Sequence, residues 1–196
     1  MRRRIEKFWM RRSWLLSVLL MISAGAQASS GSLEEGFRLS QTCAGCHGTA
    51  GASPGNTIPI IGGQTANYLG DSMRAYKDDE RQFYVMNIIA KAFSDSEIDA
   101  IAEWFASQKW VNTLTEVRAA EGGELTAACV ECHGPSGKGT DLGPRIAGQP
   151  ATYMIKVLGE YKSGSRKNIG ALQMAIVATL SDRDLETLAH HYAGLR

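Results

Sequence analysis

Cys43-Ala44-Gly45-Cys46-His47-Gly48 recurs 86 residues later as Cys129-Val130-Glu131-Cys132-His133-Gly134. Four further features recur in the same order: Pro59-Ile60-Ile61-Gly62-Gly63-Gln64 as Pro144-Arg145-Ile146-Ala147-Gly148-Gln149, Tyr68 as Tyr153, Tyr76-Lys77 with Arg81 as Tyr161-Lys162 with Arg166, and Ser94-Asp95-Ser96-Glu97-Ile98 as Ser181-Asp182-Arg183-Asp184-Leu185. Chance does not preserve so many matches in one order. The chain is therefore a tandem duplication of a module of about 80 residues.

Each module is predicted to be mostly helical. Ser94 and Glu97 form a capping box, the side-chain pattern that starts a helix, and Ser181 and Asp184 offer a weaker version of it. Apolar residues follow each cap at helical spacing and are expected in the core. They are Ile98, Ile101, Ala102 and Phe105 in the first module, and Leu185, Leu188, Ala189 and Tyr192 in the second. No run alternates as a strand requires, so the predicted fold class is all-α.

The Cys-x-x-Cys-His pattern is the attachment signature of a c-type haem. Both thiols add to the haem vinyl groups as thioethers, and the adjacent histidine lies in position to bind the iron. The residues concerned are Cys43, Cys46 and His47 in the first module, and Cys129, Cys132 and His133 in the second. The sequence thus predicts two covalently bound haem c groups.

Three other roles for the cysteines account for the two motifs less well than haem attachment does. A zinc site wants its second Cys-x-x-Cys about 15–20 residues after the first, whereas 82 residues intervene here. Redox-active disulfides of the thioredoxin type would lie beside a βαβ pattern, and none is present. Structural disulfides would leave both following histidines unexplained.

The second axial position of each iron decides between a carrier and an enzyme. Met86 and Met174 occupy equivalent places in the repeat, eight and seven residues before the capping serines. This equivalence favours them as ligands, whereas the non-equivalent Met73 and Met154 are expected to fill the core. A thioether sulfur favours ferrous iron and leaves no open position for oxygen or peroxide. The sequence therefore predicts an electron carrier and not an enzyme.

The first 28 residues are predicted to be an export signal. Basic residues stand at positions 2–4, 7, 11 and 12, an apolar run extends from Trp14 to Ile22, and Ala26-Gln27-Ala28 follows. This order is typical of a secretory signal peptide cut after Ala28, and so short a run does not span a bilayer, which needs about 20 residues. We expect a periplasmic protein without a transmembrane anchor after cleavage. Its domains would be residues 29–110 and 111–196, with a linker at 108–116.

The whole chain after residue 28 resembles the tandem dihaem cytochromes c, both the cytochrome c-four group and the cytochrome subunit of flavocytochrome c sulfide dehydrogenase. The resemblance rests on both Cys-x-x-Cys-His-Gly motifs, both Pro-x-x-x-Gly-Gln stretches and the segment from Met174 to Ser181. It implies two all-α class I cytochrome c domains with their haems close together. It also implies that His47 and Met86 bind one iron, and His133 and Met174 the other.

The same resemblance suggests roles for three further repeat pairs. The carbonyls of Pro59 and Pro144 would accept the Nδ1–H of the haem-binding histidines. Arg81 and Arg166 match positions near haem propionates, although a solvated surface arginine explains them equally well. Gly36 and Gly122, each seven residues before the first cysteine of its module, match glycines that let the terminal helices cross closely.

Two functions remain open on sequence grounds. The first is a periplasmic shuttle that moves single electrons between a quinol-oxidising complex and a terminal oxidase or reductase. The second is the haem-bearing subunit of a complex in which a flavoprotein oxidises sulfide. A dihaem enzyme is disfavoured, because peroxidases of that kind are longer and the thiosulfate-oxidising type resembles chains with a cysteine ligand. No fifth cysteine exists here.

The formal net charge of +1 argues against nucleic acid as a partner. Residues 29–110 hold 6 basic and 10 acidic groups, whereas residues 111–196 hold 9 of each. We therefore expect the acidic first domain to face cationic partners and the more neutral second domain to face anionic ones.

Overall fold

The computed structural model describes residues 32–113, 122–167 and 171–196, without the side chains of 171–174. The predicted signal peptide lies outside these ranges, as do residues 114–116 at the end of the predicted linker. Within them the chain is helical, and its one isolated β-bridge joins Thr140 and Gly143 without forming a strand. The described part contains no helix that is both long and apolar enough to cross a membrane.

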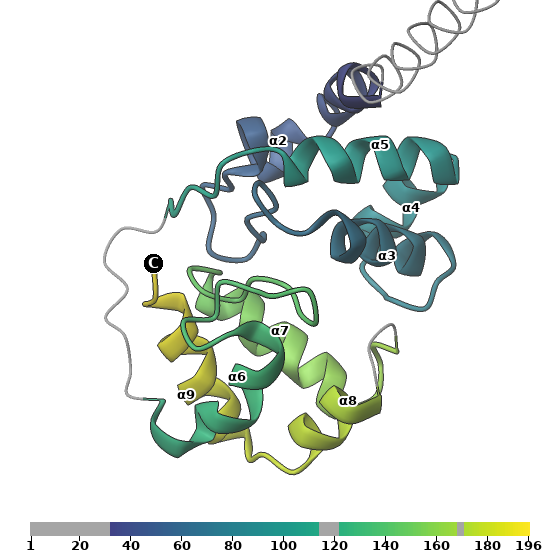
Figure 1. Cartoon of the computed structure of the whole chain (residues 1–196). Helices are drawn as coiled ribbons and strands as arrows, with labels where there is room; N and C mark the ends of the chain where they lie inside the picture. The colour runs from purple at the N-terminus through teal and green to yellow at the C-terminus, as the bar shows by residue number, and fades with distance from the viewer. Residues whose placement is uncertain (1–31, 114–121, 168–170) are drawn as a thin grey trace, which may run out of the picture.

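The first domain comprises the helical residues 32–40 and the elements up to α5 (Figure 1). These elements are α2 (Ala44–His47), η1 (Thr49–Gly51), α3 (Ala66–Lys77), α4 (Tyr84–Lys91) and α5 (Asp95–Ala106). The second domain comprises η2 (Gly123–Thr126), α6 (Ala127–His133), α7 (Ala151–Lys162), α8 (Ala171–Ala178) and α9 (Asp182–Ala193). The order of the helices repeats, as the duplicated sequence predicts.

Equivalent helices pack in both domains. In the first, α3 contacts α5 and α4, and in the second, α7 contacts α9 and α8. The predicted apolar stripes of α5 and α9 are buried. They form two clusters: Ile101, Ala102 and Phe105 pack with Leu39 and Leu69, and Leu188, Ala189 and Tyr192 pack with Met154.

Both predicted helix starts are confirmed. The Ser94 side chain accepts a hydrogen bond from the backbone N–H of Glu97, whose carboxylate accepts from the backbone N–H of Ser94. Ser181 and Asp184 form the same reciprocal box. The second box is therefore complete, although its carboxylate side chain is one methylene shorter.

Two glycines allow the chain to pass close to the last helix of each domain. Gly36 lies in a helix, as expected, whereas Gly122 directly precedes η2. A Cβ on Gly36 would lie 2.8 Å from Trp104 Cβ in α5, and one on Gly122 would lie 2.7 Å from the ring carbon Cγ of His191 in α9. Neither distance is compatible with a side chain. The start of each domain therefore lies directly against its last helix.

The two domains meet along the loops that follow α2 and α6 (Figure 1). These loops contain the two Pro-x-x-x-Gly-Gln stretches. The contacts between the loops are hydrogen bonds with pseudo-twofold symmetry, and they place the histidine of each motif near the domain boundary.

Candidate haem sites

Each Cys-x-x-Cys-His motif forms a short helix. Cys43 caps α2, and α6 contains Cys129, Cys132 and His133. None of the four cysteines is in a disulfide, so all are available for attachment. Residues three apart lie on one helix face, so both thiols of a motif can reach the same flat group. Burial raises the pKa of the Cys43 and Cys129 thiols.

A proline carbonyl fixes the histidine of each motif. His47 Nδ1–H donates to the Pro59 carbonyl oxygen at 3.0 Å, and His133 Nδ1–H donates to that of Pro144 at 2.7 Å. Burial lowers the pKa of both rings, so they are neutral. Because a carbonyl only accepts, the proton stands on Nδ1, and the lone pair of Nε2 is left for a metal.

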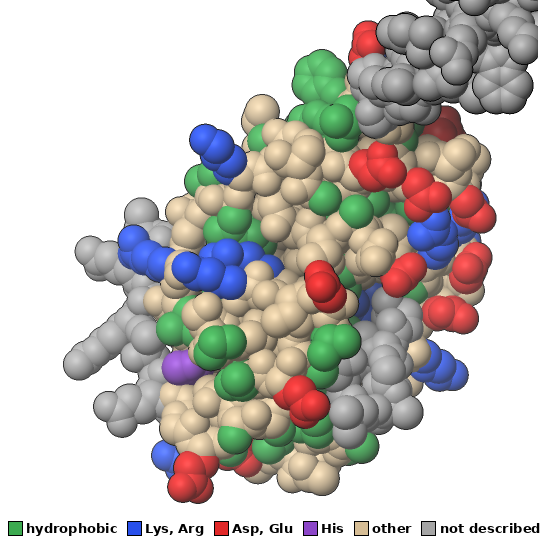
Figure 2. All heavy atoms as spheres, in the orientation of Figure 1, with side chains coloured by type: hydrophobic (Ala, Val, Ile, Leu, Met, Phe, Trp, Pro, Cys, Tyr) green, Lys and Arg blue, Asp and Glu red, His purple; other side chains and the backbone are tan. Residues whose placement is uncertain are grey.

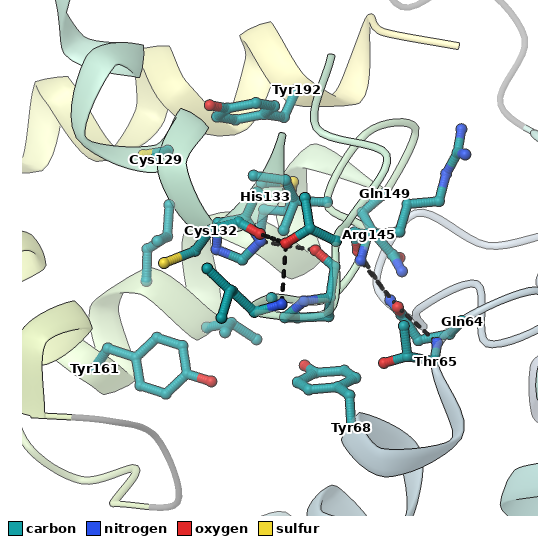
Figure 3. Close-up of a pocket in the computed structure, with 18 of the residues that line it drawn as sticks. Gln64, Thr65, Tyr68, Cys129, Cys132, His133, Arg145, Gln149, Tyr161 and Tyr192 are labelled. Atoms are coloured by element: carbon teal, nitrogen blue, oxygen red, sulfur yellow. Dashed lines mark hydrogen bonds between the residues drawn. The ribbon is translucent and has the colours of Figure 1, made fainter. Parts of the chain in front are cut away.

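A cavity of about 670 Å³ lies beside the second motif. That volume is within the usual range for a cofactor site. Figure 3 shows Cys132 and His133 on one side of it and Tyr161 on the other, while Gln64, Thr65 and Tyr68 enter from the first domain. The first domain therefore closes the second domain's site.

The predicted methionine ligands lie on equivalent helices, Met86 in α4 and Met174 in α8. Met86 is half-buried, and the side chain of Met174 lies outside the described part. Met154, expected in the core, is indeed buried there, but it also lines the cavity of the second domain. The structure thus offers a second thioether near that site.

The turn before α4 is ordered by a residue that sequence reasoning missed. Asn87 Oδ1 accepts from the backbone N–H of Phe83 at 2.7 Å, and Asn87 Nδ2 donates to the carbonyls of Tyr76 and Arg81, both at 2.8 Å. The buried amide thereby ties α4 to the end of α3. It holds the backbone of the adjacent Met86 in place.

Arg81 lies buried at the domain boundary, with 4% of its surface exposed, so it is not a solvated surface residue. Its Nη2 donates to the hydroxyl of Tyr153 in the other domain at 3.2 Å, and its guanidinium lies 4.5 Å from the ring centre of Tyr76. Arg166 repeats the arrangement with Tyr68 and Tyr161, at 3.2 and 4.5 Å.

The guanidinium charges act on the tyrosine between them. Burial alone would raise the pKa of Tyr68, but the positive charges of Arg166 and Arg81 outweigh burial and lower it to about 8. Within the described chain, the buried Nε of Arg81 has no hydrogen-bond partner. A buried cation with an unused donor fits a carboxylate. The boundary thus suits the propionates of a haem.

Covalent attachment points, a neutral histidine with a free Nε2, a cavity of suitable size and buried cations for carboxylates occur together here. A chain with one such motif in each of two helical domains is a dihaem c-type cytochrome. It carries two c-type haems, and it transfers electrons.

Comparisons with known proteins agree. The Cytochrome c family model matches residues 33–109 and again 119–191. Cytochrome c4 of Pseudomonas aeruginosa is 32% identical over 92% of this chain and 98% of its own length. The crystal structure of reduced cytochrome c4 from Pseudomonas stutzeri superposes with a TM-score of 0.71 at 30% identity, covering 83% of this chain and 98% of that one. The chain belongs to the cytochrome c family, as a tandem dihaem member of the c4 type.

Two further relatives are named for partner enzymes. The thiosulfate dehydrogenase electron acceptor of Thiomonas intermedia is 30% identical over 78% of each chain. The cytochrome subunit of sulfide dehydrogenase from Chlorobaculum tepidum is 41% identical over 35% of this chain and 62% of its own. Like the cytochromes c4, this chain is an electron carrier and not an enzyme.

Gln64 and Gln149 are the other residues that sequence reasoning overlooked. They appear in the repeat only as the ends of the Pro-x-x-x-Gly-Gln stretches. Both are buried, with 3% and 5% of their surfaces exposed, and each bonds to the backbone of the opposite domain. Their recurrence five residues after a proline was the only hint in the sequence. That they bond across the domain boundary becomes visible only when the two domains are docked.

Proposed function

We propose that the protein is a periplasmic carrier that passes single electrons between a quinol-oxidising complex and a terminal oxidase or reductase. The observation that carries this proposal is the fixed, neutral state of both motif histidines, each with Nε2 free for iron. The predicted export signal supports the compartment, because haem proteins of this kind with a signal peptide act outside the cytoplasm.

The axial ligands in this proposal are His47 and Met86 in the first domain, and His133 and Met174 in the second. A haem bound in this way supplies an iron that gains or loses one electron without exchanging ligands. The histidines hold their Nδ1 protons on the proline carbonyls, so the rings do not turn. Asn87 keeps the Met86 backbone fixed. With a methionine bound opposite each histidine, neither iron would have an open position for oxygen or peroxide.

An exposed apolar surface on α4 supports docking at the first domain. The α4 patch consists of Phe83, Tyr84, Val85 and Ile88, and the Tyr84 side chain is 81% exposed. It lies at the start of the helix that contains Met86, and two residues separate it from the acidic run Asp78 to Glu80. The nearby Lys91 is already paired with Asp79 at 2.6 Å.

The charge around this patch favours a cationic partner. Figure 2 shows acidic side chains gathered on the part of the first domain formed by α3 and α5. An apolar centre with an acidic rim is complementary to a redox protein that carries basic groups around its own apolar docking face. We assign the α4 patch to such a partner.

A second candidate function is electron acceptance from a sulfur-oxidising enzyme. The names of the Thiomonas and Chlorobaculum relatives favour it, since one accepts electrons from thiosulfate dehydrogenase and the other is a subunit of sulfide dehydrogenase. In that case the chain would be bound permanently or transiently to the dehydrogenase.

Native isolation from the periplasm, followed by absorption spectra, separates the two. The carrier proposal predicts a two-haem protein free of flavin that is reduced by a quinol-oxidising complex and reoxidised by a terminal oxidase. Co-purification with a flavoprotein and immediate reduction by sulfide would contradict it. The carrier proposal would also be contradicted if thiosulfate reduced the protein, and did so only in the presence of a bound dehydrogenase.

A further inference from the structure

The glutamines at the domain boundary form two matching clamps. Gln149 Nε2 donates to the carbonyl oxygen of Ile60 at 2.7 Å, and its Oε1 accepts from the backbone N–H of Ile60 at 3.1 Å. Gln64 makes the same pair of bonds to the backbone of Arg145, both at 2.9 Å. Each side-chain amide thus bonds to both the backbone N–H and the carbonyl of one residue in the other domain.

The residue bound by each glutamine directly follows a proline, and the carbonyl of that proline accepts a hydrogen bond from a haem-binding histidine. The N–H of Ile60 and the carbonyl of Pro59 belong to one peptide group. That group accepts from His47 Nδ1–H at its oxygen and donates to Gln149 at its nitrogen. Pro144 and Arg145 supply the equivalent peptide group between His133 and Gln64.

Hydrogen bonds in such a chain strengthen one another. When the N–H of a peptide group donates, electron density moves to its carbonyl oxygen, which then becomes a better acceptor. A stronger acceptor at Nδ1 makes the imidazole a more basic iron ligand and stabilises ferric iron. The burial of Ile60, Gln64 and Gln149 keeps water from replacing these bonds.

Both ends of the peptide group are hydrogen-bonded in each domain. The glutamine bond to the peptide nitrogen measures 2.9 Å at Arg145 and 3.1 Å at Ile60. The histidine bond at the other end of the same peptide group measures 2.7 Å at Pro144 and 3.0 Å at Pro59.

We infer that each glutamine is a positioning residue for the haem of the opposite domain: Gln149 lowers the reduction potential at His47, and Gln64 lowers that at His133. This inference rests on the proposed histidine ligation. It makes the domain boundary a connection between the two haems, because docking completes both clamps. An isolated domain would lose the glutamine of the other domain, which bonds to the peptide group behind its own histidine.

The test uses the reduced, ¹⁵N-labelled two-haem protein. In the wild type, the Nδ1–H signals of His47 and His133 must show the ring-current shift of a haem ligand. Its absence would refute the proposed ligation before any variant is made. If the shift is present, deuterium exchange at each Nδ1–H reports the strength of its bond to the proline carbonyl.

The variants are Gln149→Met and Gln64→Met, which keep the side-chain volume but remove the amide. We expect Gln149→Met to accelerate exchange at His47 and raise the potential of the first haem only. Gln64→Met should do the same at His133 and the second haem. Unchanged exchange and potentials, or equal shifts of both haems in each variant, would overturn the inference.

Two further variants separate polarisation from simple docking. Gln149→Glu keeps an acceptor for the Ile60 N–H but loses the donor, so slow exchange at His47 should persist and the first potential should not rise. A rise equal to that of Gln149→Met would overturn the inference.

Tyr153→Phe removes a different cross-domain hydrogen bond, and it should leave exchange at both histidines unchanged. Acceleration there would indicate a purely structural role and also overturn the inference.

Discussion

Arg166 of the second domain donates a hydrogen bond to the hydroxyl of Tyr68 in the first, at 3.2 Å. Its repeat counterpart, Arg81, donates to Tyr153 in the opposite direction. The duplication therefore produced a reciprocal interface in which each domain supplies the cation for the other. The pKa of Tyr68, which lies between them, reports whether carboxylates neutralise these cations.

The pKa of Tyr68 tests whether haem carboxylates occupy the boundary. With the guanidiniums free to act on it, the pKa is lowered to about 8. A phenol whose pKa falls on folding adds stability as pH rises from about 8 to its ordinary value near 10. If propionates neutralise the arginines, this gain is lost. We expect no increase in unfolding free energy relative to Tyr68→Phe between pH 8 and 10, and an increase there would place the propionates elsewhere.

Asn87→Ala should destabilise the first domain and loosen Met86. The substitution strands the buried Tyr76 and Arg81 carbonyls and the Phe83 N–H. Such losses cost about 1–3 kcal/mol. Thermal unfolding should show that loss, together with a weakened methionine–iron absorption band in the ferric protein. The exposed Asn67 provides the control, because Asn67→Ala should change stability by less than about 0.5 kcal/mol.

Gly36→Ala should separate the first helical segment from α5. Its Cβ would fall 2.8 Å from that of Trp104, and overpacking of this kind costs about 1–3 kcal/mol. Gly159→Ala is the matched control, since a Cβ at that position in α7 meets nothing within 4 Å. It should stabilise the helix by up to about 1 kcal/mol. Equal effects of the two variants in chemical denaturation would argue against the close crossing.

The α4 patch should govern reaction with a cationic redox protein. Ile88→Ser and Tyr84→Ser remove exposed apolar contacts beside the Met86 helix position. We expect each to raise the KM for that partner about tenfold, the equivalent of about 1.4 kcal/mol. Leu142→Ser, at a 73% exposed residue of the second domain, should have little effect. Stopped-flow rates should fall with added salt, and rates indifferent to salt would contradict the charge assignment.

The sequence predicted the repeat, the helices and the attachment motifs because these depend on local spacing. Both capping boxes and both apolar stripes lie where their periodicity placed them. The proline carbonyls were expected from family resemblance, and the geometry confirms them.

The domain boundary was beyond sequence reasoning. Arg81 could equally have been a solvated residue, and nothing in the Pro-x-x-x-Gly-Gln pattern shows that Gln149 reaches Ile60 across 89 residues. Such contacts depend on how two folded domains dock. Met154 shows the same limit, because its core position also brings it to the wall of the second site.

In the proposed ligation, one histidine and one repeat-equivalent methionine bind each iron. Potentiometric titration of Met86→His and Met174→His tests it most directly, with Met154→Leu as the control. Because a thioether raises the potential relative to an imidazole, each histidine variant should lower the potential of one haem and leave the other unchanged, while Met154→Leu should preserve both. Wild-type potentials in Met86→His or Met174→His, or loss of methionine ligation in Met154→Leu, would contradict the assignment.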